Sequence, residues 1–244
     1  MSLRGRRLSA LYQHRFDGLW DYRLEVWRRL VEGLLEPRYM HAANSILDLG
    51  AGHGEFILNT FAPIRIAMDL DPDIETAVGQ AGITVLHHDC TTAWPIPRNS
   101  IDVVFSSNLL EHLTSKSAIE LALGHAFEAI KPGGNIVLMG PNIRFVGDDY
   151  WDYWDHYIPL TENAICEVLR ITGFDVVTVI PRFLPYTMSK GRPKPLWLVS
   201  LYLKLPLAWR MLGKQFLVVG SKPSPHELPD SRGKRPRYCP NPGQ

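Results

Sequence analysis

Three glycines at alternating positions follow a short apolar run, residues 46–49, that contains an acid. The residues that could meet a ligand here are Asp48, Gly50, Ala51, Gly52 and Gly54. Glycine has no Cβ atom, so the backbone at such positions can bend sharply and approach a ligand closely. A helix that follows the turn would present its unpaired N–H groups to the same ligand. The pattern therefore predicts a strand, a nucleotide-binding turn and a helix.

The spacing of these glycines differs from that of dinucleotide-binding proteins. Their third glycine comes three positions after the second, whereas in this chain Glu55 holds that position and the third glycine is Gly54. The spacing argues against NAD and against an NAD-linked oxidoreductase.

Two further acids follow predicted strands downstream of the glycine turn. Asp69 stands where a carboxylate can accept both hydroxyls of a ribose held over the turn, and Asp89 could meet an adenine edge. Each acid alone has a structural alternative, because strand ends in loops are commonly Asp. Together with the glycine turn they favour a site for an adenosyl compound.

From Ser45 onward, short β-rich runs alternate with helical stretches, which predicts an α/β fold with a parallel sheet and crossover helices. The predicted strands are residues 46–49, 64–68, 83–87, 101–105, 136–139, 174–180 and 215–220. The predicted helices are residues 8–36, 72–81 with Asp71 as N-cap, 117–130, and 162–172 with Thr161 as N-cap. Residues 131–134, Lys-Pro-Gly-Gly, predict a turn. We expect a helical preface over 1–43, the main domain over 44–221 with an apolar insertion at 184–214, and a disordered tail over 222–244.

At this point the chain resembles the class I S-adenosylmethionine-dependent methyltransferases. The matching segments, in the order of that family, are 48–54, 68–72, 88–90, 100–104, 110–113 and 130–134. The resemblance implies a Rossmann-like, mostly parallel sheet of seven strands with helices on both faces and the last strand antiparallel. It also implies S-adenosylmethionine as cofactor.

By the same resemblance, Gly50 and Gly52 lie under the methionine moiety and Asp69 holds the ribose. Asp89 and the backbone of Cys90 flank the adenine, and Asn108 lies near the sulfonium. The matching segments add four residues to the expected cofactor site, namely Asp48, Ala51, Gly54 and Leu70.

Transfer of a methyl group to a hydroxyl needs a base, and histidine is the usual choice near neutral pH. The segment 149–157 interleaves aromatic residues with acids and ends in His156 and Tyr157, so it could form a lid that stacks on a sugar. Alternatively, these aromatics only pack a loop onto the core, with His156 on the surface. His112 is the second candidate base, although its place in the family's Glu-His-Leu pattern favours a structural or cofactor-side role.

We expect the acceptor to be a small molecule or a glycan, methylated at oxygen rather than nitrogen. Residues 106–110, Ser-Ser-Asn-Leu-Leu, lack the Pro-Pro-aromatic element with which related enzymes methylate base amines, and the net charge is only +1, so we expect no nucleic-acid partner. Segments 183–186 and 213–216 resemble bacterial methyltransferases of surface-polysaccharide synthesis. A non-catalytic protein that binds the cofactor or its demethylated product, or serves as a partner subunit, is the alternative.

The insertion at 184–214 has apolar residues set among basic ones, and Lys204 and Pro206 make it a poor membrane span. A cap over the acceptor pocket is the favoured interpretation, while peripheral membrane contact through 192–212 and a homodimer surface remain open.

Three separated cysteines, Cys90, Cys166 and Cys239, form no metal-ligand spacing, so we expect no bound metal and no disulfide framework. The N-terminus has no apolar signal region, which predicts a cytoplasmic location.

Overall fold

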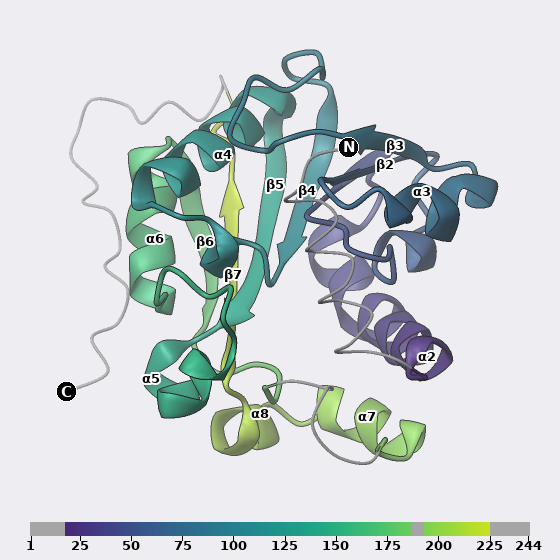
Figure 1. Ribbon diagram of the computed structural model, residues 1–244, viewed down its shortest axis with the longest axis vertical. Coiled ribbons are helices and arrows are strands. Elements are labelled where there is room, and N and C mark those ends of the chain that lie inside the picture. The colour runs from purple at the N-terminus through teal and green to yellow at the C-terminus, as the bar shows by residue number, and fades with distance from the viewer. Residues whose placement is uncertain (1–17, 187–192, 225–244) are drawn as a thin grey trace.

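The computed structural model describes residues 18–186 and 193–224. Its centre is a sheet of seven strands in the order β3-β2-β1-β4-β5-β7-β6, shown in Figure 1. The strands are β1 (Ser45–Leu49), β2 (Ile64–Asp69), β3 (Thr84–His87), β4 (Ile101–Ser107), β5 (Ile130–Pro141), β6 (Asp175–Ile180) and β7 (Gln215–Ser221). The first five are mutually parallel, and β7 runs antiparallel to both β5 and β6. The predicted seven-stranded sheet with an antiparallel last strand is therefore confirmed.

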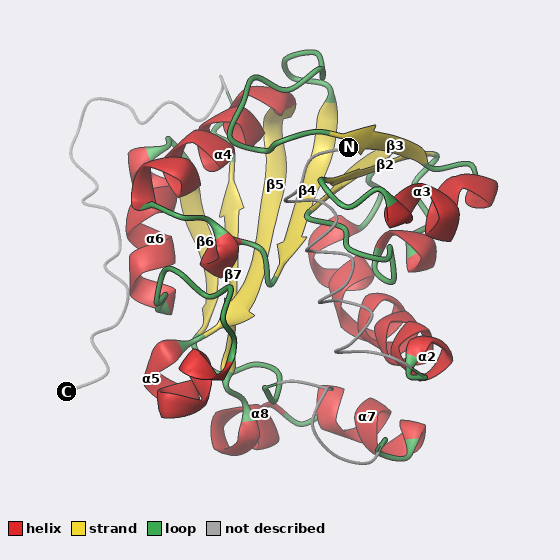
Figure 2. Cartoon of the chain, in the orientation of Figure 1, coloured by secondary structure: helices red, strands yellow, loops and turns green. Residues whose placement is uncertain are grey.

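Alternate side chains along each strand enter two separate hydrophobic clusters. In β1, Ile46 faces one cluster and Leu47 the other, and in β4 the same alternation separates Val103 from Val104. The first cluster is covered by α2 (Trp20–Leu30), the π-helical segment η1 (Val31–Met40) and α3 (Asp73–Val78), and the second by α4 (Lys116–Ala129) and α6 (Glu162–Ile171). A sheet buried on both faces explains the nearly continuous apolar strands (Figure 2).

The N-terminal helix continues beyond its predicted end. Helical residues run through η1 to Met40 with Pro37 inside, whereas the sequence predicted an end at residue 36. Leu34, Leu35 and Met40 are buried in the first cluster, so tertiary packing keeps the chain helical where proline alone predicts a stop. The predicted first part of the helix, residues 8–17, lies outside the described residues.

No full helix follows the glycine turn in the described chain, contrary to the prediction. Only the single 3₁₀ turn η2 (Ile57–Asn59) lies there, because β2 begins at Ile64 and leaves too little chain for a crossover helix. After β2 the helix α3 ends at Val78 and the 3₁₀ turn η3 (Gly79–Ala81) completes the predicted span. Pro72 is the N-cap residue rather than the first helical residue, and Asp71 Oδ1 accepts from the Asp73 backbone N–H at 3.0 Å.

The Lys-Pro-Gly-Gly segment lies within β5 rather than before it. The β4–β5 register passes from Ile101 opposite Ile130 to Val103 opposite Asn135, so residues 131–134 bulge out of the pairing. Gly133 has φ +81° there, the left-handed conformation that glycine adopts most readily. Thr161 caps α6 as predicted, since its hydroxyl accepts from the Ala164 N–H at 3.2 Å.

The described parts of the insertion form α7 (Leu196–Leu203) and α8 (Pro206–Leu212), which lie beyond one end of the sheet and across from α2 (Figure 1). Arg29 of α2 donates to the Ser200 hydroxyl at 2.9 Å, and the Lys194 N–H donates to the Tyr22 hydroxyl at 3.0 Å. Among the described helices, none has the length and apolar character needed to span a bilayer. Shorter elements near this end are η4 (Leu110–His112), α5 (Ile143–Val146) and η5 (Gly147–Asp152).

Most of the predicted tail lies outside the described residues, which end at Ser224. Its first residue, Lys222, is held by hydrogen bonds from Nζ to the carbonyl oxygens of Phe127 and Ile130, at 2.6 and 2.8 Å. The chain is therefore still anchored to the domain at the point where the tail was predicted to begin.

Candidate functional site

The glycine turn follows β1 directly and has the backbone geometry that only glycine adopts easily. Gly50, Gly52 and Gly54 have φ values of +74°, +56° and +84°. A Cβ on Gly50 would lie 2.9 Å from a methyl of Leu109, and one on Gly54 would lie 2.2 Å from a methyl of Val78. Gly50 thus permits a close approach to the turn after β4, while Gly54 allows the turn to pack against α3.

Asp69, at the end of β2, is bonded to the glycine turn. Its Oδ2 accepts from the Gly52 N–H at 2.8 Å, and its Oδ1 accepts from the Asp71 N–H at 2.8 Å. Burial raises the pKa of Asp69 above its usual range, and these backbone donors oppose the shift. A third backbone donor is the Leu70 N–H. A carboxylate has about four acceptor sites, so these three bonds leave room for a donor from a ligand.

The other predicted adenosine-side residues lie around the ends of β2 and β3. Asp89 Oδ1 accepts from both the N–H and the hydroxyl of Thr91, at 2.9 and 2.7 Å, which forms a tight turn. The Cys90 carbonyl accepts from the Trp94 indole at 2.9 Å, and the side chain of Leu70 is half-buried. The turn gives Asp89 a structural role in addition to the predicted contact with adenine.

Asp48 lies in β1 with only 3 % of its surface exposed. Its Oδ2 is buried and has no hydrogen-bond partner in the structure. Burial raises the pKa of Asp48 well above its usual range, the negative charges of Asp69 and Glu55 add to that shift, and the Ile57 N–H opposes it. A buried acceptor without a partner is costly, and a ligand that donates a hydrogen bond would satisfy it.

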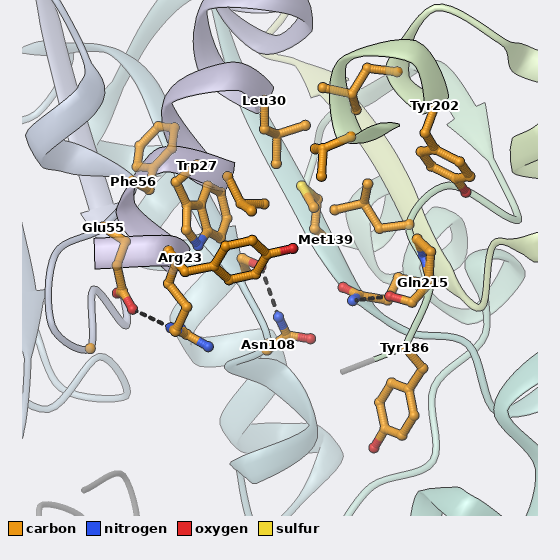
Figure 3. Close-up of a pocket in the computed structure, with 18 of the residues that line it drawn as sticks. Arg23, Trp27, Leu30, Glu55, Phe56, Asn108, Met139, Tyr186, Tyr202 and Gln215 are labelled. Carbon is orange, nitrogen blue, oxygen red and sulfur yellow. Dashed lines mark hydrogen bonds and ion pairs between the residues drawn. The ribbon is translucent and has the colours of Figure 1, made fainter. Parts of the chain in front are cut away.

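A cavity of about 580 Å³ opens beside the glycine turn (Figure 3). Asp48, Gly50, Ala51 and Gly52 line its floor. Its wall toward α2 carries Trp27 and Leu30, and the facing wall carries Met139, Tyr202 and Gln215. The predicted residues Asp69, Leu70, Asp89 and Cys90 do not line this cavity. Since β2 and β3 lie on the other side of β1 from β4, the glycine turn separates this cavity from the predicted adenosine side.

One charged pair in the cavity wall has no signal in the sequence motifs. Arg23 Nε of α2 donates to Glu55 Oε1 at 2.7 Å, and both side chains are nearly buried (Figure 3). Both residues line the cavity. Since they come from segments far apart in the chain, only the fold brings them together.

Asn108 follows β4 and has a left-handed conformation with φ +53°, which is uncommon for a residue other than glycine. Its N–H donates to the Met139 carbonyl at 3.0 Å, and its side-chain amide donates to the Ser107 hydroxyl at 3.0 Å. Asparagine tolerates this conformation better than most residues. The kink directs the chain from β4 into η4, and Asn108 lines the cavity together with the glycine turn.

The two candidate bases, His112 and His156, lie side by side on the cavity wall. Their ring centroids are 4.9 Å apart with the rings nearly perpendicular. His112 Nδ1 lies 2.8 Å from the carbonyl oxygen of Asp155 and 3.3 Å from its Oδ2. His156 Nδ1 lies 2.9 Å from the Tyr150 carbonyl. His156 is 9 % exposed, so it does not lie on the surface.

The aromatic segment 149–157 divides into buried and exposed members. Tyr150 is fully buried and donates to the Ile158 carbonyl, while the ring of Tyr153 stacks on His156 and lines the cavity. Trp151 and Trp154 are exposed, Trp154 at 89 %. Only part of this segment therefore faces the cavity where an acceptor could bind.

Glu111 is the neighbour of His112 in η4 and lines the same cavity. It is 2 % exposed, and burial raises the pKa of its carboxyl group, while the nearby imidazole of His112 opposes the shift. Its backbone carbonyl accepts from the N–H groups of Tyr157 and Ile158, at 2.8 and 3.3 Å. These bonds tie the segment after η5 to the turn after β4.

The far end of the cavity is mostly apolar. Side chains from the insertion line it, namely Leu184, Leu198, Val199, Leu201, Leu203, Leu205, Ala208 and Leu212. Gln215, at the start of β7, adds a polar group there: its Nε2 donates to the Pro185 carbonyl at 3.0 Å, and its buried Oε1 has no partner in the structure. The two helices of the insertion thus enclose an apolar space that opens toward the glycine turn.

Comparison with protein families identifies the chain. Residues 19–179 match the model of a methyltransferase-domain family, which is more than half of the sequence. The chain belongs to this family. It is a class I S-adenosylmethionine-dependent methyltransferase, and S-adenosylmethionine is its cofactor. No curated protein matches the sequence.

Solved structures share the fold at low sequence identity. An S-adenosylmethionine-dependent methyltransferase from Archaeoglobus fulgidus is 18 % identical, with a TM-score of 0.64, over 88 % of this chain and 99 % of that one. A structure of a putative methyltransferase in complex with the Haloferax volcanii Trm112 methyltransferase activator is 18 % identical, with a TM-score of 0.65. The match covers 91 % of this chain and 100 % of that one. An S-adenosylmethionine-dependent methyltransferase from Mesorhizobium loti is 18 % identical, with a TM-score of 0.54. The match covers 73 % of this chain and 90 % of that one. At this identity the likeness shows the fold alone.

Proposed function

We propose that this methyltransferase transfers a methyl group to a hydroxyl on a small molecule with a substantial apolar body. The observation that carries the proposal is the cavity, because the glycine turn, Asn108 and the imidazoles of His112 and His156 all line one space that continues between apolar helices. S-adenosylmethionine supplies an electrophilic methyl on a positively charged sulfur. The protein's task is to align the acceptor with that methyl and to exclude water.

The residues of the glycine-turn end hold the cofactor in this proposal. Asp48 accepts from its amino group with the buried Oδ2, and Asp69 accepts from its ribose hydroxyls. The Arg23 guanidinium, already paired with Glu55, brings a positive charge into the same cavity and is suited to the cofactor's carboxylate. Asn108 lies near the sulfonium.

At the other end of the cavity, one imidazole of the His112–His156 pair removes the proton of the acceptor hydroxyl. His156 is the first candidate because it is buried in the cavity wall and fixed by Tyr150 and Tyr153. His112 is the second, held by Asp155. Imidazole is the side chain most often used to remove a proton near neutral pH.

The apolar lining between α7 and α8 favours an acceptor with an apolar body over a bare glycan. Several apolar side chains on the outer side of these helices are also exposed, among them Trp197, Leu207 and Met211. These features support an acceptor carried by a lipid, to which a sugar could still be attached.

Incubation of the purified full chain with methyl-labelled S-adenosylmethionine and a panel of acceptors tests the proposal. The panel contains apolar phenols, lipid-linked sugars, water-soluble nucleotide sugars and small amines. We expect label to be transferred to oxygen in the apolar or lipid-linked compounds. Transfer to amines alone, or to soluble sugars alone, would contradict the proposed acceptor. Tight binding of S-adenosylhomocysteine without transfer to any member would favour the non-catalytic alternative.

A further inference from the structure

Three side chains in the cavity wall converge in a way that the sequence does not suggest. Among the described residues, Glu111, His112 and His156 each offer one potential ligand atom, and these atoms lie within 4.8 Å of one another. All three residues line the cavity. We infer that they form a binding site for one divalent transition-metal ion, with Glu111 and the two imidazoles as its ligands.

The tautomers that the hydrogen bonds select are those of metal-binding histidines. An Nδ1 atom close to a backbone carbonyl must carry the proton, and the lone pair is then on Nε2. His112 meets this condition at the Asp155 carbonyl, and His156 meets it at the Tyr150 carbonyl. Histidines that bind metals usually donate the second ring N–H to a carbonyl or carboxylate, which fixes the ring and raises its basicity. Asp155 supplies both kinds of acceptor to His112, since its Oδ2 lies 3.3 Å from the same nitrogen.

The backbone holds the three ligands in place independently of any ion. Glu111 and His112 are adjacent in the 3₁₀ turn η4, and the Tyr157 and Ile158 N–H groups bond to the Glu111 carbonyl. The segment that carries His156 is thereby attached to the turn that carries the other two. A metal at about 2.1 Å from each ligand requires ligand atoms roughly 3.4 Å apart, a separation that small side-chain rotations can reach from the present arrangement.

The ligand types indicate which ions fit. Two imidazoles and one carboxylate suit zinc, cobalt, nickel or ferrous iron, whereas calcium and magnesium favour sets made only of oxygen. Three protein ligands with further positions open are typical of catalytic rather than structural metal sites. The negative charge of the nearly buried Glu111 gains a partner when an ion binds.

The open position gives the ion a role in the reaction, and this part of the inference rests on the proposed function. An acceptor hydroxyl bound to the ion has a lowered pKa and releases its proton to solvent water, so in the metal-bound protein the ion replaces an imidazole base in promoting proton loss. Its oxygen then forms the new bond to the methyl carbon while the carbon–sulfur bond breaks. The electron pair of that bond stays on sulfur, which leaves as a neutral thioether.

Metal titration of the full chain, purified without a histidine tag and treated with a chelator, tests the site directly. We expect calorimetry with ZnCl₂ to give one tight ion per chain, and CoCl₂ to give the visible absorption of a bound cobalt ion with nitrogen ligands. Glu111→Gln, His112→Gln and His156→Gln should each weaken binding by at least about 10-fold. His41→Gln is the matched control, because His41 is exposed and lies after η1, away from the cavity. This variant should bind zinc with the affinity of the wild type.

Unfolding curves without metal establish that each variant is folded before its affinity is compared. Absence of tight binding to the wild type, or equal binding by the wild type and all folded ligand variants, would overturn the site. Ion binding without methyl transfer to any acceptor would leave the site standing and contradict the proposed function. Methyl transfer by a wild-type protein that binds neither ion would overturn the metal site and leave the proposed function standing.

Discussion

The two ends of the candidate site are constructed differently. At the cofactor end, Asp48 and the glycine turn are contiguous in the chain, and Asp69 reaches them through one backbone hydrogen bond to Gly52. At the acceptor end, the wall combines α2, the turn after β4, the segment 149–157 and the insertion. The first end depends on a local backbone conformation, whereas the second depends on how distant segments pack.

The chemistry of the two ends differs in the same way. The cofactor end places carboxylates and backbone N–H groups around a conformation with positive φ, which suits a ligand rich in polar groups. The acceptor end is an apolar space with a few polar groups, among them Gln215 and the imidazole pair. In the proposed function, one scaffold keeps its cofactor end while the insertion helices α7 and α8 select the acceptor, so fold alone does not identify the substrate.

The largest effect is expected from His156→Ala at the acceptor end. Loss of this imidazole should lower kcat by about 10²–10⁴-fold, whether it acts as a base or as a metal ligand, because either role serves proton removal. The affinity for S-adenosylhomocysteine, measured by calorimetry, should remain unchanged. Trp154→Ala, a change to a residue that is 89 % exposed in the same segment, is the control and should retain full turnover. Full turnover in the His156 variant would remove this residue from the chemistry.

A second, smaller effect is expected from Asp69→Ala at the cofactor end. The variant loses the acceptor of the Gly52 N–H and of the ribose hydroxyls, so cofactor binding should weaken by roughly 1–3 kcal/mol. Calorimetry with S-adenosylhomocysteine measures the change. Asp175→Ala, at the exposed start of β6, serves as control and should bind normally. Equal affinities of the two variants would mean that Asp69 has only a structural role.

The same contrast explains what the sequence could predict. The strand positions and the glycine turn followed from local patterns. The seven-stranded sheet with its antiparallel last strand was implied by the family resemblance, and the structure confirms it. The prediction of a helix after the glycine turn was wrong. The residue types there are typical of a helix start, but β2 begins too soon afterwards to leave room for a helix. The continuation of η1 past Pro37 was missed for a related reason, since burial against the sheet outweighs a local breaker.

Residues of the acceptor end were the hardest to find. Gln215 belongs to no motif, and its position in the chain gives no reason to bring it to the cavity. At the cofactor end Arg23 was missed for the same reason, because only the fold pairs it with Glu55. The sequence also predicted no bound metal, because it offers no regular spacing of ligands. Glu111 and His112 are neighbours in the chain, but His156 joins them only through the backbone bonds between η4 and the segment after η5.

Asp48 lies where the two ends meet, and its titration distinguishes binding from stability. Folding buries its carboxyl near Asp69 and Glu55, of which Glu55 is paired with Arg23, and the pKa of Asp48 is raised as a result. Because the folded state then holds the proton more tightly than the unfolded state does, the free energy of unfolding falls as pH rises. The fall begins near the ordinary pKa of Asp, about 3.9, and ends at the raised value in the folded protein.

Asp48→Asn should therefore stabilise the cofactor-free protein at neutral pH by roughly 0.5–2 kcal/mol, the usual size of a single stabilising substitution. The amide can still accept from the Ile57 N–H and can donate toward the neighbouring carboxylates. Urea unfolding at several pH values should show a smaller decline with pH than in the wild type. The same variant should bind S-adenosylhomocysteine more weakly, because its amide cannot match a carboxylate as partner of the ligand's ammonium group. A loss of stability at neutral pH together with unchanged binding would mean that the buried charge is a structural feature of β1 and not part of the cofactor end.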